Sequence, residues 1–171
     1  YYDKSAEEGE IQNPYLPSLS EELLDQIATL LIPEDERAIL EEMIWSIDER
    51  GYLIVELEFM AEKFEVDISL MERLHKQLTQ LEPLGIGSRS LQECLLIQIQ
   101  KIHPDTPAHY IIRDYFDEFA NKRFERILRK LHLTKSDLRD AEVLISQLNP
   151  KPGDGYLDPK TNYVTPDFYI R

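Results

Sequence analysis

The side chains best suited to catalysis or metal binding in this sequence are four histidines and one cysteine. The histidines, His75, His103, His109 and His132, lie on different predicted elements, and none has a His or Cys partner at a helical spacing. Zinc ligands usually occur in such closely spaced pairs, so the sequence predicts no metal site. Cys94 stands inside an apolar helical pattern, which predicts a small buried side chain rather than a nucleophile.

The glycines and carboxylates offer no clearer catalytic site. Gly85-Ile86-Gly87 follows a predicted helix rather than a strand, and no Lys-Ser or Lys-Thr pair closes it, so a nucleotide-binding loop is not predicted. Carboxylates are abundant, but abundance without a predicted pocket assigns no acid or base. We therefore predict a protein that is not an enzyme and takes no cofactor. A single cysteine permits no internal disulfide, which fits a reducing cytoplasmic setting.

Charge divides the chain into two unlike halves. Residues 1–80 hold 20 acidic and 6 basic side chains, whereas residues 81–171 hold 13 of each, so the first half carries the whole formal charge of -14. A surface of that sign repels a phosphate backbone. We expect the first half to meet a basic protein surface, and the alternative is a set of solvated helix faces that keep the protein soluble.

One segment of the second half is suited to contact nucleic acid. One short predicted helix carries five cations and a single acid, Glu125. The cations are Lys122, Arg123, Arg126, Arg129 and Lys130. They support an alternative hypothesis, a helical transcription regulator that binds DNA through residues 122–130, beside the simpler one of a solvated face balancing the acidic half. The next predicted helix carries Asp137, Asp140 and Glu142 where a major-groove reader presents Arg, Lys, Asn or Gln.

The elements that must position these residues are predicted to be helices. The chain has 171 residues, 42% of them hydrophobic, which allows a modest folded core. No apolar run approaches the roughly 18 residues needed to cross a bilayer, so no membrane partner is expected. Residues 1–17 combine acids with Gly and Pro and predict an acidic flexible linker. Residues 18–82 show apolar spacings of three and four, which predicts a first helical bundle.

Capping signals and breakers locate the elements more closely. Ser18 and Glu21 predict a capping box before an apolar face that extends to Leu31, and Pro33 ends that helix. Pro83 interrupts the pattern and predicts the turn that leads into a second bundle over 83–150. From 151 to 171 the composition shifts to Pro, Gly, Asp and aromatic residues. The predicted fold class is all-α: two small helical bundles joined by a Pro/Gly turn, followed by an extended or short-strand tail.

Four segments together resemble the core-binding domain of sigma-54 (sigma-N) bacterial transcription factors. The longest, at 81–96, reads LEPLGIGSRSLQECLL, and the others are IDERGYL at 47–53, LNPKPG at 148–153 and YVTPDF at 163–168. All four occur in the family's order, which makes the match far more specific than any one motif. The family commonly has Asp, Ala and Asp at the positions of Glu82, Ser88 and Ser90, and these are mild changes.

The resemblance implies a sigma factor that binds core RNA polymerase and directs it to promoters of the -24/-12 type. It also implies that an ATP-dependent activator acts on the holoenzyme, and that the first bundle lies near the flap region of the beta subunit. The chain begins at Tyr1 and stops before the family's C-terminal helix-turn-helix, so we expect a fragment. Promoter DNA would then be contacted only through regions missing from it.

Exposed polar residues are the expected points of contact with polymerase. The candidates are Glu41, Asp48, Glu49, Arg50, Glu62 and Arg89. A second set is expected to shape the turns, with glycines for unusual backbone angles and a capping box of Ser90 and Glu93. Its members are Pro83, Gly85, Gly87, Ser90, Glu93, Pro150, Pro152 and Gly153.

Overall fold

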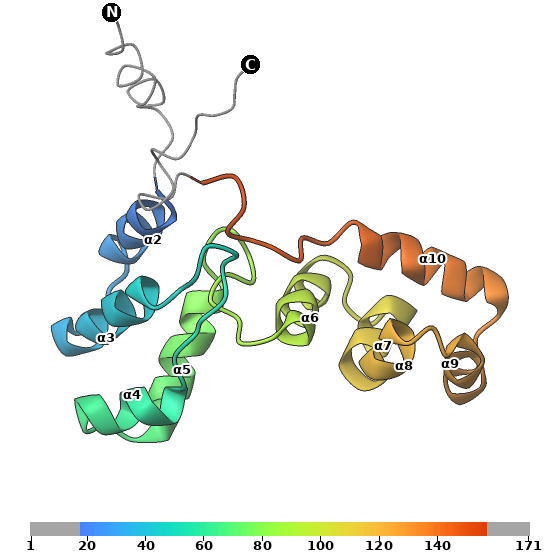
Figure 1. The fold of residues 1–171 in the computed structure, drawn as a ribbon, viewed down its shortest axis with the longest axis horizontal. Coiled ribbons are helices and arrows are strands. Elements are labelled where there is room, and N and C mark those ends of the chain that lie inside the picture. The colour runs from blue at the N-terminus through green and yellow to red at the C-terminus, as the bar shows by residue number, and fades with distance from the viewer. Residues whose placement is uncertain (1–17, 157–171) are drawn as a thin grey trace, which may run out of the picture.

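A computed structural model describes residues 18–156, and within that range nine helices form two bundles without a sheet (Figure 1). This confirms the all-α fold class. The linker predicted over 1–17 and the part of the predicted tail after residue 156, including the motif at 163–168, lie outside the described residues.

The first bundle contains four helices whose apolar faces share one core. They are α2 (Leu19–Ala28), α3 (Glu34–Trp45), α4 (Leu57–Phe64) and α5 (Ile68–Thr79). The capping box at Ser18 and Glu21 is present, as predicted. Leu40, Met43 and Leu74 are wholly buried in the core, and burying each such side chain stabilises the fold by about 1.5–3 kcal/mol.

The end of α2 differs from the prediction. The helix ends at Ala28, so Leu31 has left the apolar face and is wholly exposed. Arg37 of α3 reaches back and donates hydrogen bonds to the carbonyls of Ile27 and Leu30, the latter at 2.8 Å. The last carbonyls of α2 are therefore satisfied by a neighbouring helix, which allows the helix to stop before Pro33.

The second bundle contains five helices around a separate core. They are α6 (Leu91–Ile102), α7 (Pro107–Asp114), α8 (Phe116–Ala120), α9 (Phe124–Leu131) and α10 (Lys135–Ser146). Thr106 and Thr134 cap α7 and α10 with their side chains, and the Thr134 cap forms a full capping box with Asp137. Ile99, Ile111 and Ile127 are wholly buried between these helices.

The prediction that all five cations of 122–130 lie on one helix is wrong. Helix α9 begins only at Phe124, and Arg123 is its N-cap residue. Lys122 has a φ of 60° in the turn before it. The backbone N–H groups of Lys122 and Arg123 bond back to Phe119 and Glu118, so the turn that closes α8 takes up these two residues.

Three segments that are far apart in the sequence meet between the bundles. They are the turn after α3, the turn between α5 and α6, and the chain leaving α10, drawn in teal, green and red (Figure 1). The N–H of Leu53 donates to the Ser88 carbonyl at 2.9 Å, and the N–H of Gly87 donates to the Gly51 carbonyl at 2.7 Å. We call this meeting point the junction. It brings together the three described motifs that carry the family resemblance.

Candidate partner-binding site

The turn after α3 is built around the carboxylate of Asp48. Its Oδ1 accepts hydrogen bonds from the backbone N–H groups of Arg50, Gly51 and Tyr52 at 3.0, 3.0 and 2.9 Å. Glu49 and Arg50 are exposed at the tip of this turn. Of these three predicted contact residues, Asp48 therefore serves the fold, while the other two are presented to solvent.

We call residues 149–156, which follow α10, the exit segment. Two glycines allow this segment to lie directly on the turn after α3. Gly51 has a φ of +102°, and a Cβ there would lie 2.7 Å from the backbone nitrogen of Gly153. A Cβ on Gly153 would lie 2.6 Å from the Glu49 carbonyl oxygen. The Gly153 N–H donates to the Arg50 carbonyl at 2.8 Å, and the neighbouring Pro152 is buried. Backbone thus packs on backbone, which only glycine permits.

A polar network ties the exit segment to both bundles. The Tyr52 hydroxyl donates to the Pro150 carbonyl at 2.6 Å. The Gln98 side chain donates to the Asn149 carbonyl at 2.7 Å and accepts from the Asn149 N–H at 2.8 Å. Burial raises the pKa of the Cys94 thiol, and burial with the nearby Cys94 raises the pKa of Tyr52 to about 12. Cys94 is buried as predicted, and its thiol stays protonated near neutral pH.

The turn between α5 and α6 also depends on glycine. Pro83 follows a cis peptide bond, and the Glu82 N–H before it donates to the Gln26 side chain at 2.8 Å. Gly85 and Gly87 have φ values of +90° and +80°. A Cβ on Gly87 would lie 2.6 Å from a methyl carbon of Leu78. The turn therefore packs directly against the core of the first bundle.

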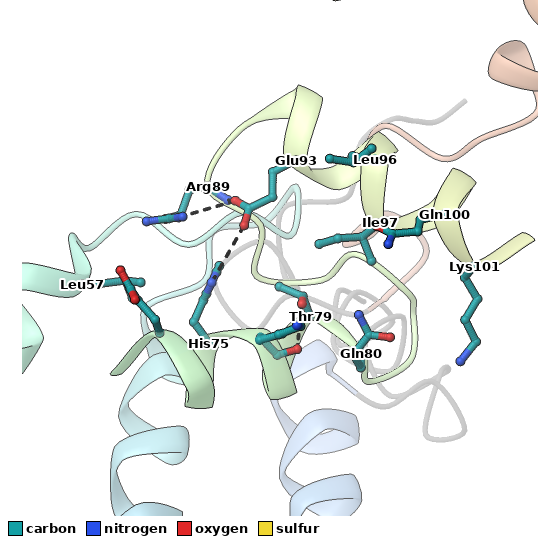
Figure 2. Close-up of a pocket in the computed structure, with 12 residues that line it drawn as sticks. Leu57, His75, Thr79, Gln80, Arg89, Glu93, Leu96, Ile97, Gln100 and Lys101 are labelled. Atoms are coloured by element: carbon teal, nitrogen blue, oxygen red, sulfur yellow. Dashed lines mark hydrogen bonds and ion pairs between the residues drawn. The ribbon is translucent and has the colours of Figure 1, made fainter. Parts of the chain in front are cut away.

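A groove of about 630 Å³ lies between α5 and α6, and Figure 2 shows Arg89, Glu93 and His75 gathered at one part of its wall. The Glu93 carboxylate accepts from the Arg89 N–H at 2.8 Å, and its other oxygen lies 3.9 Å from Nδ1 of His75. His75 is buried, and its Nε2–H donates to the Gly87 carbonyl at 2.7 Å. Arg89, a predicted contact residue, lies half-exposed at this edge.

The capping box predicted at Ser90 and Glu93 is only half formed. The Ser90 hydroxyl accepts from the Glu93 N–H at 3.2 Å, as expected. The Glu93 carboxylate does not return to the Ser90 N–H but accepts from Arg89, one residue earlier. The Arg89 N–H and the Arg89 side chain, 3.5 Å from the same Glu93 oxygen, hold the carboxylate away from the cap.

Helices α3 and α4 carry the remaining two predicted contact residues. Lys63 of α4 binds Glu42 of α3 at 2.6 Å, and this ion pair bridges the two helices. Glu41 and Glu62, each next to one member of the pair, are both exposed. The two acids therefore flank the place where α3 and α4 are tied together.

Three large apolar side chains around this ion pair are exposed, and none was among the residues that the sequence predicted as contacts. Trp45, Ile54 and Phe59 are 64%, 68% and 60% exposed. Trp45 lies one turn after Glu42, Phe59 lies one turn before Lys63, and the Ile54 N–H bonds to Ser46 beside Trp45. We call these three residues the α3–α4 patch. A helical projection of α3 would have placed Trp45 away from its buried residues.

The predicted sites thus separate into distinct regions. The turn-shaping residues and Arg89 gather at the junction, whereas Glu41 and Glu62 lie beside the α3–α4 patch. The cations of 122–130 are on and before α9, at the end of the molecule opposite α3 and α4 (Figure 1). Among residues 18–156 no cluster of three His, Cys, Asp or Glu side chains is placed to hold a metal ion. None of the described helices is long and apolar enough to span a membrane.

Comparison with known proteins places the chain in a family. The family described as "Sigma-54 factor, core binding domain" matches residues 10–171. The RNA polymerase sigma-54 factor of Escherichia coli K12 is 33% identical over 161 residues, 90% of this chain and 34% of that protein. The RNA polymerase sigma-54 factor of Shewanella violacea is 38% identical over 144 residues, 80% of this chain and 29% of that protein. The chain spans about a third of the length of these relatives.

The chain is also similar to a solved structure. The "Structure of the Core Binding Domain of sigma54" covers 84% of this chain and 99% of its own, with a TM-score of 0.49 and 24% identity. The family match itself extends over nearly the whole sequence, from residue 10 to residue 171. The chain therefore belongs to the sigma-54 factor core-binding-domain family.

Proposed function

We propose that this chain is the part of a sigma-54 type sigma factor that binds core RNA polymerase. In that role it supports initiation at promoters of the -24/-12 type, under the control of ATP-dependent activators that act on the holoenzyme. It has no catalytic step of its own and works in the cytoplasm. The observation that carries the proposal is the family match over residues 10–171. The alternative of a stand-alone DNA-binding regulator is not favoured by that match.

The surface best suited to this docking is the α3–α4 patch. Protein interfaces have an apolar centre surrounded by a polar rim, and Trp is the residue most enriched among the side chains that contribute most to affinity. Trp45, Ile54 and Phe59 supply such a centre because more than half of each side chain is exposed. Glu41 and Glu62 supply acids at its edge.

The charge of the first bundle indicates the chemistry of the partner. Residues 18–82 hold 17 acidic and 5 basic side chains, a net charge of -12. A partner that meets this patch should present apolar side chains surrounded by Lys and Arg. We propose that the beta flap region of polymerase provides it. Glu49, Arg50 and Arg89, exposed at the junction, would lie at the rim of a larger interface.

The experiment is a competition assay with residues 1–171 and bacterial core polymerase. We expect saturable binding that full-length sigma-54 displaces. Trp45→Ala should weaken the affinity by about 10- to 100-fold, the range of an interface residue whose truncation costs 1.4–2.8 kcal/mol. Glu41→Gln with Glu62→Gln should mainly slow association and reduce its salt dependence.

Leu31→Ala is the matched control, because Leu31 is wholly exposed but lies outside the patch. Its affinity should equal that of the unchanged chain. Equal losses in Leu31→Ala and Trp45→Ala would remove the patch from the proposal. Failure of the chain to bind polymerase at low salt, or to be displaced by full-length sigma-54, would overturn the proposed function itself.

A further inference from the structure

The five cations on and before α9 form an exposed cluster whose charge is poorly balanced within the chain. We call Lys122, Arg123, Arg126, Arg129 and Lys130 the α9 cation cluster. All five are exposed. Within residues 18–156 only Arg126 has an acidic partner, Glu118, at 3.5 Å, and that arginine is itself 54% exposed. The other four cations have no acidic side chain of the described residues within ion-pair distance.

Part of the cluster lies where the helix dipole opposes it. Lys122 and Arg123 lie at the N-terminal end of α9, where the dipole is positive and acids are favoured, whereas Arg129 and Lys130 lie in the last turn, where the dipole favours cations. Arg126 and Lys130 are four residues apart, a like-charge spacing that destabilises a helix. An external anion near Lys122, Arg123 and Arg126 would relieve this repulsion.

The cluster offers no apolar centre to a protein partner. The apolar residues of α9, including Phe124, Ile127 and Leu128, pack in the core of the second bundle. The exposed large apolar side chains of the described residues all lie outside 116–135, the nearest along the chain being Ile102 and Val143. The centre of a protein interface is depleted of charged residues, whereas Lys and Arg supply most of the affinity for a phosphate backbone.

We infer that the α9 cation cluster binds the phosphate backbone of duplex DNA without reading its sequence. The eight residues of α9 extend about 12 Å, over which one DNA strand places three or four phosphates. The neighbouring helix α10 carries Asp137 and Asp140, whereas base edges are contacted mainly by Arg, Lys, Asn and Gln, so sequence-specific contacts are not expected there. The cluster lies at the end of the molecule opposite α3 and α4 (Figure 1), so both surfaces are free to act together.

The test is a fluorescence anisotropy titration of residues 1–171 onto a 20-base-pair duplex of random sequence. With about four phosphate contacts, log affinity should fall against log salt with a slope of about -4, or about 150- to 250-fold between 25 and 100 mM salt. Arg123→Gln with Arg126→Gln and Lys130→Gln should reduce the slope to about -1. Amide NMR shifts should be confined to residues 118–131.

The matched control removes three exposed cations elsewhere: Lys76→Gln, Lys101→Gln and Lys151→Gln. Its slope should remain about -4, although the net charge changes equally. Absence of binding at 25 mM salt, or equal losses in both triple variants, would overturn the inference. Self-association in low salt that only the first triple variant abolishes, measured by sedimentation, would show that an acidic bundle of a second copy is the occupant. No polymerase is present, so the result is independent of the proposed function.

Discussion

The contact between Gly153 and the Asp48 turn yields a sharp test of the junction. In Gly153→Ala the new Cβ would lie 2.6 Å from the Glu49 carbonyl oxygen and 2.7 Å from backbone atoms of Arg50 and Gly51. None of these is the end of a flexible side chain. The turn itself is held by the three hydrogen bonds that the Asp48 carboxylate accepts. We therefore expect the exit segment, rather than the turn, to move away.

The cost follows from what holds the exit segment in place. If the part of the exit segment from Pro150 onward moves away, two hydrogen bonds would be lost, from the Gly153 N–H to the Arg50 carbonyl at 2.8 Å and from the Tyr52 hydroxyl to the Pro150 carbonyl at 2.6 Å. Each contributes about 0.5–1.5 kcal/mol net, so detachment should lower the free energy of unfolding by about 1–3 kcal/mol. Overpacking without detachment costs about the same.

Tyr52 distinguishes detachment from simple overpacking. Its pKa is raised to about 12, mainly by burial, and detachment would return that pKa toward 10. The measurement combines urea unfolding with a pH titration followed by NMR of labelled tyrosine. Gly155→Ala is the control, because Gly155 also has a positive φ, +95°, but has nothing within 4 Å of the added Cβ. It should cost about 1 kcal/mol of backbone strain and leave the Tyr52 pKa unchanged.

Two results would refute this reasoning. One is a Gly153→Ala variant that unfolds at the same urea concentration as the unchanged chain. The other is a destabilised Gly153→Ala variant in which the Tyr52 pKa stays near 12, because the exit segment would then have remained in place.

Three further predictions concern a cap, a phenol and a thiol. Thr134→Ala removes one half of the α10 capping box, the bond that the Thr134 hydroxyl accepts from the Asp137 N–H, and should lower the free energy of unfolding by about 1 kcal/mol in urea titrations; unchanged stability would contradict this. The Tyr52 pKa is higher in the folded chain than in the unfolded chain, so its contribution to stability is complete below pH 10 and is lost as the pH rises through about 12. Tyr52→Phe should remove that part of the alkaline loss in circular dichroism titrations, and identical curves would argue against it. Cys94 is buried with a raised pKa, so a thiol reagent should label it slowly in the native chain and rapidly in denaturant; prompt native labelling would exclude that burial.

Local sequence signals predicted most of the helices because their causes are local. A cap such as Ser18 with Glu21 joins residues three positions apart, and the spacing of Ile39, Met43 and Ile44 is a property of one helix. The predictions that were wrong depended on neighbours. Leu31 is exposed because α2 ends early, where Arg37 of another helix bonds the carbonyls of Ile27 and Leu30.

The candidate site depended on contacts that leave no local pattern. The sequence indicated the polar residues and the family motifs, but not that Trp45, Ile54 and Phe59 are exposed together. Exposure is decided by which faces of α3 and α4 remain uncovered after the helices pack. The sequence alone therefore indicated polar contact residues such as Glu41 and Glu62, but not the apolar residues of the α3–α4 patch beside them.

The sequence by itself determined the helical class, several helix caps and the family, because periodicity, caps and motif order are written along the chain. Only the tertiary structure decided that three motifs form one junction. Tyr52 and Pro150 are 98 residues apart, yet their hydrogen bond is 2.6 Å long. The packing of Gly51 on Gly153 is equally remote along the chain. Such contacts form only after both bundles have folded and brought their turns together, and short-range spacing therefore carries no signal of them.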